Sequence, residues 1–307
     1  MKKLIAVFLL FAACSCKKKD QLPVTEPVKE KYIPVTASLD AYTKVQYGNM
    51  PLVISVPHGG SMQPAGIPNR TCPGITTVTD IGTIALLLVI DSIAGADYNI
   101  KPSWIYTDLS RIKIDENRAL PEATCSNPAV YQYWNNYHTG LDTCIGRLLT
   151  RYPQCIFIDL HGHGHTIQRC ELGYLLTAGE LQNPSTLMYS GSSLNHGAGI
   201  FGGKTIQQMV SGSTAFGSYL FTNGFAAVPA ATDPAPAAAD PYFDGGYNTA
   251  WYTGTGYPKV FGWQIETNYT GLRDNYTDRM AFAKAFMRSI IAYFNNNTNM
   301  PAVSFGY

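Results

Sequence analysis

Residues 51–60 read Pro-Leu-Val-Ile-Ser-Val-Pro-His-Gly-Gly, and the rest of the chain is organised around this stretch. The run from Leu52 to Val56 is apolar and rich in β-branched residues, which predicts a strand buried on both faces. Pro57 has no N–H to donate, so it ends the strand. His58 follows at the carboxyl end of the strand, where open α/β sheets bind their ligands. A histidine in a glycine turn can also be incidental, so this stretch alone does not establish a site.

A second segment, residues 155–165, is built in the same way. It reads Cys-Ile-Phe-Ile-Asp-Leu-His-Gly-His-Gly-His, an apolar strand followed by three histidines with glycines between them. Because His161, His163 and His165 are spaced by two, an extended backbone would point the three imidazoles to the same side. Neutral imidazole is the commonest transition-metal ligand. Two strands that both end in histidine therefore predict a metal site, whereas a random surface cluster fits poorly directly after a core strand.

The chain has 307 residues, of which 46% are hydrophobic, and this is enough to bury the core of one large domain over residues 33–307. We expect strands near 52–56, 156–160, 171–177, 225–228 and 260–266. We expect helices from Thr79, from Asn127-Pro128, and over 205–221 and 277–295. Alternating strands and helices predict an α/β fold, a three-layer α/β/α sandwich with a mostly parallel mixed central sheet. The net charge of +1 and the lack of a basic stripe argue against a nucleic-acid partner.

Two details of these elements are also predicted. In the helix from Thr79, which is a plausible N-cap, the residues expected on the buried face are Ile81, Ile84, Ala85 and Leu88. The segment from Ala230 to Tyr252 is rich in Ala, Pro, Gly and Asp. Such a composition predicts an irregular surface segment, and its length marks it as a candidate substrate-binding loop.

The first residues resemble a bacterial lipoprotein signal. A basic start at residues 1–3 precedes an apolar stretch, 4–13, that is too short to span a membrane as a helix. We therefore expect a signal peptide over residues 1–16 and a flexible tether over 17–32. The protein would be exported and anchored in the periplasm, at the outer membrane or at the cell surface, with the lipid as its only membrane contact. Either Cys14 or Cys16 can carry the lipid, and the lysine-rich context that follows favours Cys16.

Five further cysteines leave the disulfide pattern open. They allow two disulfides at most, and none has the C-x-x-C spacing of a zinc ribbon. Cys155 begins a predicted buried strand and is expected to belong to the core. The five residues are Cys72, Cys125, Cys144, Cys155 and Cys170.

Asp80 is the first Asp, Glu or His after His58 in the sequence. Together with His58 and His161 it would form a His-carboxylate-His zinc site whose fourth position is open to water. Asp80 can alternatively serve only the dipole of the helix that follows it. Glu266 ends the last predicted strand, where a carboxylate can take a proton from water as general base. Its alternative role is that of an acid in the following loop.

The segment from Tyr106 to Arg118 is unusually charged for this protein and contains two candidate substrate contacts. Arg111 can polarise a scissile carbonyl and stabilise an oxyanion. Arg118, with Asn117, can bind a substrate carboxylate through its planar guanidinium. Each arginine alone can instead form a structural salt bridge, for which the nearby acids are Asp108, Asp115 and Glu116.

Six segments in order along the chain resemble the N-formylglutamate amidohydrolase family, which is related in fold to zinc carboxypeptidases. They are Val-Pro-His-Gly-Gly at 56–60, Thr-Asp at 79–80, Asp-Leu-Ser-Arg with Glu-Asn-Arg within 108–118, Asp-Leu-His-Gly-His at 159–163, Gly-Gly-Tyr-Asn-Thr at 245–249 and Gln-Ile-Glu at 264–266. The resemblance implies a zinc-carboxypeptidase-like (phosphorylase/hydrolase-like) fold. It also implies cleavage of a C–N amide bond in an N-acyl amino acid or peptide that has an acidic or carboxylate end.

The resemblance also implies roles for individual residues. Zinc would be bound by His58, Asp80 and His161, and Glu266 would be the general base. Arg111 would contact the transition state, and the substrate contacts would be Asn117, Arg118 and Tyr247.

Two departures from the pattern leave the substrate open. Ser61 stands where the carboxypeptidase H-x-x-E pattern has its acid, and the 108–118 segment is longer than the usual Asp-Leu-Asn-Arg. A carboxypeptidase or γ-glutamyl peptide hydrolase is therefore an alternative, as is a surface lipoprotein that binds acidic peptides or amino acids without cleaving them. The roles of His163 and His165 also stay open: they can line the pocket, hydrogen-bond locally or replace a metal ligand.

Overall fold

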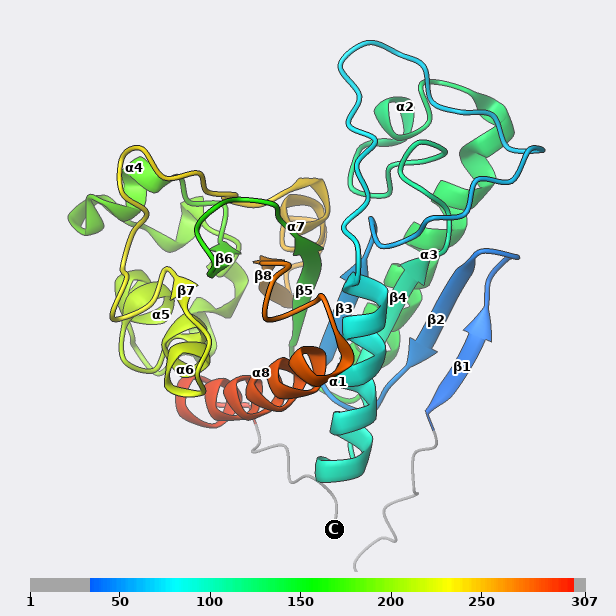
Figure 1. Ribbon diagram of the computed structural model, residues 1–307. Helices are drawn as coiled ribbons and strands as arrows, with labels where there is room; N and C mark the ends of the chain where they lie inside the picture. Colours follow the sequence, from blue (N-terminus) through cyan, green and yellow to red (C-terminus); the bar gives the residue numbers. More distant parts are fainter. Residues whose placement is uncertain (1–33, 301–307) are drawn as a thin grey trace, which may run out of the picture. The chain divides into compact units, whose positions relative to one another are not determined.

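The described part of the protein, residues 34–300 of a computed structural model, is built on one eight-stranded mixed sheet (Figure 1). The predicted signal peptide and tether, including Cys14 and Cys16, lie outside the described residues. In chain order the strands are β1 (Val35–Ser38), β2 (Thr43–Tyr47), β3 (Leu52–Val56), β4 (Ser103–Thr107), β5 (Cys155–Gly162), β6 (Cys170–Gly173), β7 (Ala227–Val228) and β8 (Val260–Thr267).

Across the sheet the strand order is β1-β2-β4-β3-β5-β8-β6-β7. The four central strands, β4, β3, β5 and β8, are parallel, so their carboxyl ends meet at one edge. On the two sides, β2 is antiparallel to both β4 and β1, and β6 is antiparallel to β8. The predicted α/β fold with a mixed sheet is therefore confirmed. Strands β1 and β2 lie before the first strand that the sequence predicts.

Helices cover both faces of this sheet (Figure 1). On one face lie α1 (Thr83–Tyr98) and α8 (Tyr276–Asn297), and on the other lies α3 (Tyr131–Leu149). Strand β3 has apolar side chains on both of its faces, so helices can pack on each. Leu52, Ile54 and Val56 belong to the core under α1 and α8, whereas Val53 belongs to the core under α3. The shorter helices are α2 (Leu120–Ala123), α4 (Ala178–Leu181), α5 (Ile206–Ser211), α6 (Phe216–Thr222) and α7 (Tyr247–Tyr252), and the 3-10 turns are η1 (Pro128–Val130), η2 (Pro184–Thr186), η3 (Tyr189–Gly191) and η4 (Asn195–Ile200).

Helix α1 begins later than predicted, at Thr83 instead of Thr79. The Thr79 hydroxyl donates to the Gly60 carbonyl, and the Asp80 N–H donates to the His58 carbonyl, so residues 79–82 run along the end of β3 before the helix can start. Gly82 then begins the helix with a left-handed φ of 89°. The predicted buried face is also wrong, because Ile81 is 63% exposed, and the buried residues include Leu86, Leu87, Ile90 and Ile93.

Other boundaries differ where the backbone turns. The helix predicted over 205–221 is two helices, α5 and α6, separated at residues 212–215. Strand β6 ends at Gly173, before the predicted 177, because the backbone turns at Leu175, whose φ is 61°. The Asn127-Pro128 start is confirmed, since the Asn127 side chain accepts the Ala129 N–H ahead of η1 and α3. Within residues 34–300, no helix combines the length and apolarity that a membrane crossing requires.

Trp263 of β8 provides a test of the core. Its side chain is fully buried, with ring centroids 4.9 Å from Phe216 and 5.1 Å from Tyr293. Trp263→Ala should lower the free energy of unfolding by about 3–5 kcal/mol, because it leaves a large cavity. The matched control, Trp251→Ala, removes a side chain that is 52% exposed and should cost less than about 1 kcal/mol. Urea denaturation measures both, and equal losses would contradict this description of the core.

Candidate active site

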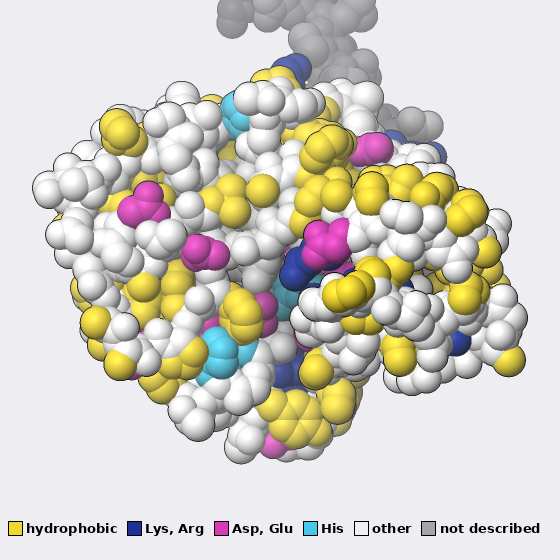
Figure 2. Space-filling view, turned by 90° about the horizontal axis from the view of Figure 1, so that it is seen from above, with side chains coloured by type: hydrophobic (Ala, Val, Ile, Leu, Met, Phe, Trp, Pro, Cys, Tyr) yellow, Lys and Arg dark blue, Asp and Glu magenta, His cyan; other side chains and the backbone are white. Residues whose placement is uncertain are grey.

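The residues predicted to carry chemistry meet at the carboxyl ends of the central strands. His58 follows β3, and His161 is the last residue but one of β5. Glu266 of β8 is the direct Cα partner of His161. Asp80 joins them because its N–H is bonded to the His58 carbonyl. Figure 2 shows this end of the molecule, where histidine, acidic and basic side chains gather in a hollow of the surface.

His58, Asp80 and His161 form a compact group with the geometry of a metal site. The Asp80 Oδ2 atom lies 3.6 Å from Nδ1 of His58 and 3.1 Å from Nδ1 of His161. The ligand atoms of all three residues lie within 4.8 Å of one another. In tetrahedral zinc sites with bonds of about 2.0–2.1 Å, ligand atoms are roughly 3.3 Å apart, so the donor set and its spacing fit zinc. All three residues are largely buried.

Each histidine is oriented by a second carboxylate that the sequence did not identify for this role. The Nε2 atom of His58 lies 2.7 Å from Asp115, and Nε2 of His161 lies 2.9 Å from Asp159. Both Nδ1 atoms are therefore directed at Asp80. A carboxylate behind a ligating histidine is the usual support of a metal-binding imidazole, since it fixes the ring and its tautomer. The fit of this group to a divalent cation thus extends beyond the three ligands.

The electrostatics of the group favour positive charge at its centre. Burial by itself would lower the pKa of His161, but the carboxylates of Asp159, Asp80 and Glu266 raise it well above its ordinary value. Burial by itself would raise the pKa of Asp80, but hydrogen bonds from His161 and His58 outweigh it and hold the pKa well below its usual range. A cation at this point would supply the charge that a proton on His161 otherwise provides, and its binding would release that proton.

Glu266 has the environment of a proton-transfer group. Burial raises its pKa to about 8; His161 opposes this rise, and Asp80 adds to it. Gln264 donates a 2.9 Å hydrogen bond to Oε1 and so orients the carboxyl group. A general base or acid is most effective when its pKa lies near the working pH. A cation at the neighbouring histidines would favour the ionised form of Glu266.

The two predicted arginines have different surroundings. Arg111 is buried and its Nε donates to Asp115 at 2.8 Å, so it has the structural ion pair considered from the sequence. Its two terminal nitrogens donate to no group of the described chain and remain able to bind a ligand. Arg118 is more exposed, and its Nε pairs with Glu122 at 2.9 Å instead of one of the acids considered.

Asn117 and Tyr247 lie on the α7 side of the group. The Asn117 Nδ2 atom is 3.3 Å from Nε2 of His161, and its Oδ1 accepts the Asn248 N–H at 2.7 Å. Its amide therefore connects the site to the first turn of α7. Tyr247 begins that helix, is half-buried and stacks on Trp251 with ring centroids 5.8 Å apart.

Arg273 is an important residue that no sequence pattern indicated. Its guanidinium donates to the carbonyls of Ile81, His163 and Thr267, which belong to the segments that carry Asp80, His161 and Glu266. It packs directly on Gly162, where an added Cβ would lie only 2.2 Å from the guanidinium carbon. Gly162, between His161 and His163, is thus the sequence feature that reflects the packing of the Arg273 side chain.

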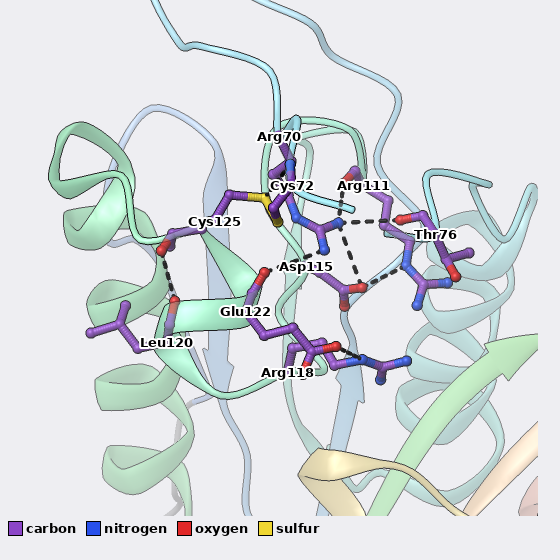
Figure 3. The surroundings of a disulfide bond; sticks show 10 residues. Arg70, Cys72, Thr76, Arg111, Asp115, Arg118, Leu120, Glu122 and Cys125 are labelled. Atoms are coloured by element: carbon purple, nitrogen blue, oxygen red, sulfur yellow. Dashed lines mark hydrogen bonds and ion pairs between the residues drawn. A yellow bond between two sulfur atoms is a disulfide. The ribbon is translucent and has the colours of Figure 1, made fainter. Parts of the chain in front are cut away.

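A disulfide connects two of the segments that surround the site (Figure 3). Cys72 pairs with Cys125, which resolves part of the pattern left open by the sequence, and the other cysteines of the described residues are buried free thiols. Beside it, Arg70 donates to the carbonyls of Thr76 and Arg111. The disulfide and this arginine therefore join the segment before Asp80 to the segment that carries Arg111 and Asp115.

Comparisons with known proteins support the fold. No protein-family model matches the chain, and no curated protein resembles it in sequence. The structure is similar to that of an N-formylglutamate amidohydrolase from Ralstonia eutropha, with 13% identity, a TM-score of 0.50, and coverage of 84% of this chain and 97% of that one. A gene product of Agrobacterium tumefaciens matches with 12% identity, a TM-score of 0.46, and coverage of 84% and 96%. An N-acetylmuramyl-L-alanine amidase of Mycobacterium smegmatis matches with 12% identity, a TM-score of 0.38, and coverage of 82% and 99%.

The first of these similarities shows that the two chains share a fold. At 13% identity it does not carry the activity of that protein to this one. Function depends on the residues of the site and not on the fold alone.

Glu116, between Asp115 and Asn117, gives the site a pH dependence of stability. It is fully buried, neither carboxyl oxygen has a hydrogen-bond partner among the described residues, and burial raises its pKa well above 4.5. Above the ordinary pKa the unfolded chain loses the proton of this carboxyl group, whereas the folded protein keeps it. Glu116 therefore lowers the free energy of unfolding increasingly as the pH rises. Above about pH 5, Glu116→Gln should therefore gain stability relative to the wild type as the pH rises, as measured by urea denaturation. A difference that does not vary with pH would contradict this assignment.

Proposed function

We propose that the protein is a zinc-dependent hydrolase that cleaves the amide bond of an N-acyl amino acid or peptide with a carboxylate end. The observation that carries the proposal is the group of His58, Asp80 and His161, in which each histidine is oriented by its own carboxylate. Glu266 lies beside this group, on the neighbouring strand. A fold shared with a structure named as an N-formylglutamate amidohydrolase agrees with this proposal.

Zinc bound by these three residues would polarise a carbonyl and lower the pKa of water. Glu266 then accepts the proton of the attacking water and returns it to the nitrogen of the leaving amine as the C–N bond breaks. Arg111 can donate from its free terminal nitrogens to the oxyanion that develops on the carbonyl oxygen, because its Nε is fixed on Asp115. Arg273 holds the three supporting segments together through their backbone carbonyls.

Arg118 is the candidate for binding the carboxylate end of the substrate. Its side chain is about one third exposed, and the pair with Glu122 leaves its NH2 nitrogen available for an anion. Asn117 has less freedom, because its amide already holds Asn248 and lies against His161. We therefore assign Asn117 to positioning α7, with Tyr247 at its start, and the carboxylate contact to Arg118.

The alternative, a surface protein that binds such ligands without cleaving them, has one strong argument against it. Binding alone does not require a buried carboxyl group of raised pKa next to a metal group, and Glu266 is such a group. We also propose that the protein is an exported lipoprotein anchored by Cys14 or Cys16. The disulfide between Cys72 and Cys125 supports this location, because disulfides persist mainly in oxidising compartments.

The first test separates the metal from the proton transfer. Glu266→Gln should retain about one zinc per chain and lose turnover of N-acyl glutamates by about 10²–10⁴-fold, because the amide cannot accept the proton. His161→Ala should lose the zinc itself, since a ligand is removed. Metal analysis and hydrolysis assays measure the two effects. The hydrolase mechanism would be excluded by wild-type protein that binds no transition metal even after incubation with zinc, and a fully active Glu266→Gln variant would remove this residue from the mechanism.

The carboxylates behind the histidines give a second prediction. Asp115→Asn should weaken zinc binding by about 10–100-fold, because the amide no longer stabilises the oriented His58 ring. Chelator competition measures the affinity. The matched control is Asp142→Asn on α3, whose carboxylate accepts a hydrogen bond from the Tyr257 hydroxyl and which should leave zinc binding unchanged. Equal affinities in the two variants would show that Asp115 does not support the metal ligand.

A further inference from the structure

His165 is held in one orientation by a buried carboxylate. Its Nδ1 atom lies 2.7 Å from Oε1 of Glu171, which is fully buried. The second oxygen of Glu171 accepts the Phe243 N–H at 2.9 Å, so both oxygens of the carboxylate are held by a partner. The Phe243 ring stacks on the imidazole with centroids 4.8 Å apart and an interplanar angle of 10°. The orientation of the His165 ring is thus determined by two contacts, with Glu171 and with Phe243, which are themselves joined by a hydrogen bond.

His165 and His163 differ in whether a ring nitrogen is left without a hydrogen-bond partner. His163, the other histidine nearby, donates from Nε2 to the Arg169 carbonyl at 2.8 Å and accepts the His165 N–H at Nδ1, so both of its ring nitrogens are engaged. The Nε2 atom of His165 has no partner among residues 34–300, and the side chain is 22% exposed. Although the ligand atoms of His163, His165 and Glu171 lie close together, the hydrogen bonds favour an oriented imidazole over a second metal site.

The position of this histidine relative to the proposed metal group follows from the sheet. Glu171 is the Cα partner of Glu266, which is the Cα partner of His161, so the three residues form a row across β6, β8 and β5. Neighbouring strands are about 4.8 Å apart, which places the backbone of Glu171 roughly 10 Å from that of His161. The segment with Arg111 and Arg118 follows β4, on the other side of β3 and β5. The metal group therefore lies between the arginines and His165.

The segment that carries Phe243 is firmly attached to the sheet. Arg169, which is buried, pairs with Asp233 at 2.9 Å and with Asp240 at 3.1 Å. The Tyr242 hydroxyl donates to the Leu172 carbonyl of β6. Phe243 nevertheless keeps 43% of its surface exposed. An aromatic ring that is fixed and yet exposed is suited to contact a ligand, since little conformational entropy is lost on binding.

We infer that His165 and Phe243 form a subsite for the acyl side of the substrate, and that the substrate is a peptide or an N-acylated peptide. This inference rests on the proposed function, because it takes the arginine side to bind the carboxylate end. A formyl group ends at the scissile carbonyl and would leave this subsite empty. An extended peptide advances about 3.3–3.6 Å per residue, so two residues and an N-terminal cap cover a distance of the order of the roughly 10 Å between the backbones of His161 and Glu171, the residue to which His165 is bonded. A peptide bond also offers both a donor and an acceptor to the free Nε2.

Two probes with the same leaving group test the subsite on the full-length chain. They are N-formyl-L-glutamate and N-acetyl-L-alanyl-L-alanyl-L-glutamate. We expect the wild type to prefer the peptide in kcat/KM, and His165→Ala to lower that preference by about tenfold, as the loss of one oriented hydrogen bond predicts. Phe243→Ala should act in the same direction. The matched control is His196→Ala, at the opposite end of β5, where the ring bonds to the Gly254 carbonyl.

A binding measurement separates this inference from the proposed function. In the Glu266→Gln background, calorimetry should show tighter binding of the peptide than of formylglutamate, and adding His165→Ala should reduce this difference in affinity by about tenfold. An unchanged preference, or no binding of either probe, would overturn the subsite, even in a protein that hydrolyses formylglutamate. A preference in binding without hydrolysis by the wild type would keep the subsite and refute the hydrolase. Zinc content of two per chain that falls to one in His165→Ala would instead assign the group to a second metal.

Discussion

Four of the buried carboxyl groups at the edge of the sheet lie at or beside the two histidines His58 and His161, and their desolvation constrains the rest of the site. They belong to Asp80, Asp115, Asp159 and Glu266. Because a buried charge is costly unless it is paired, each of them needs a compensating partner. Asp115 has Arg111 and His58, and Asp80 and Asp159 share His161. Glu266 needs no such partner while it is protonated, because burial raises its pKa to about 8. The arrangement combines a surplus of buried negative groups with two imidazoles, which is the electrostatic environment of a cation.

The parts of this site that could be predicted are those that depend on local sequence. An apolar β-branched run followed by Pro or Gly and histidine indicates a strand end, and the central strands β3, β5 and β8 place His58, His161 and Glu266 as expected. Parallel strands bring such ends together whatever the intervening sequence. Asp80 is predictable for a simpler reason, since no other Asp, Glu or His lies between it and His58.

The parts that could not be predicted depend on contacts between segments far apart in the chain. Asp115 was considered as a partner of an arginine, and it is one, but its hydrogen bond to His58 spans 57 residues and leaves no local pattern. Arg273 acts through backbone carbonyls, which every residue possesses. The equal spacing of three histidines also misled, because β5 ends at Gly162. Only His161 keeps the strand geometry, and His163 and His165 turn toward Arg169 and Glu171.

The site therefore has two kinds of parts with different physical constraints. Its centre comes from strand ends, whose positions are set by the hydrogen bonds of the sheet. The groups proposed to contact substrate come from long irregular segments, each tied to the sheet by a few specific contacts: the Cys72–Cys125 disulfide, the Asn117–Asn248 hydrogen bond, and the ion pairs of Arg169. Loops tolerate change more readily than the elements they connect. The proposed central chemistry and the proposed acyl-side subsite can therefore vary separately, because the sheet positions the residues of the first and the 230–246 segment, with Phe243, contributes to the second.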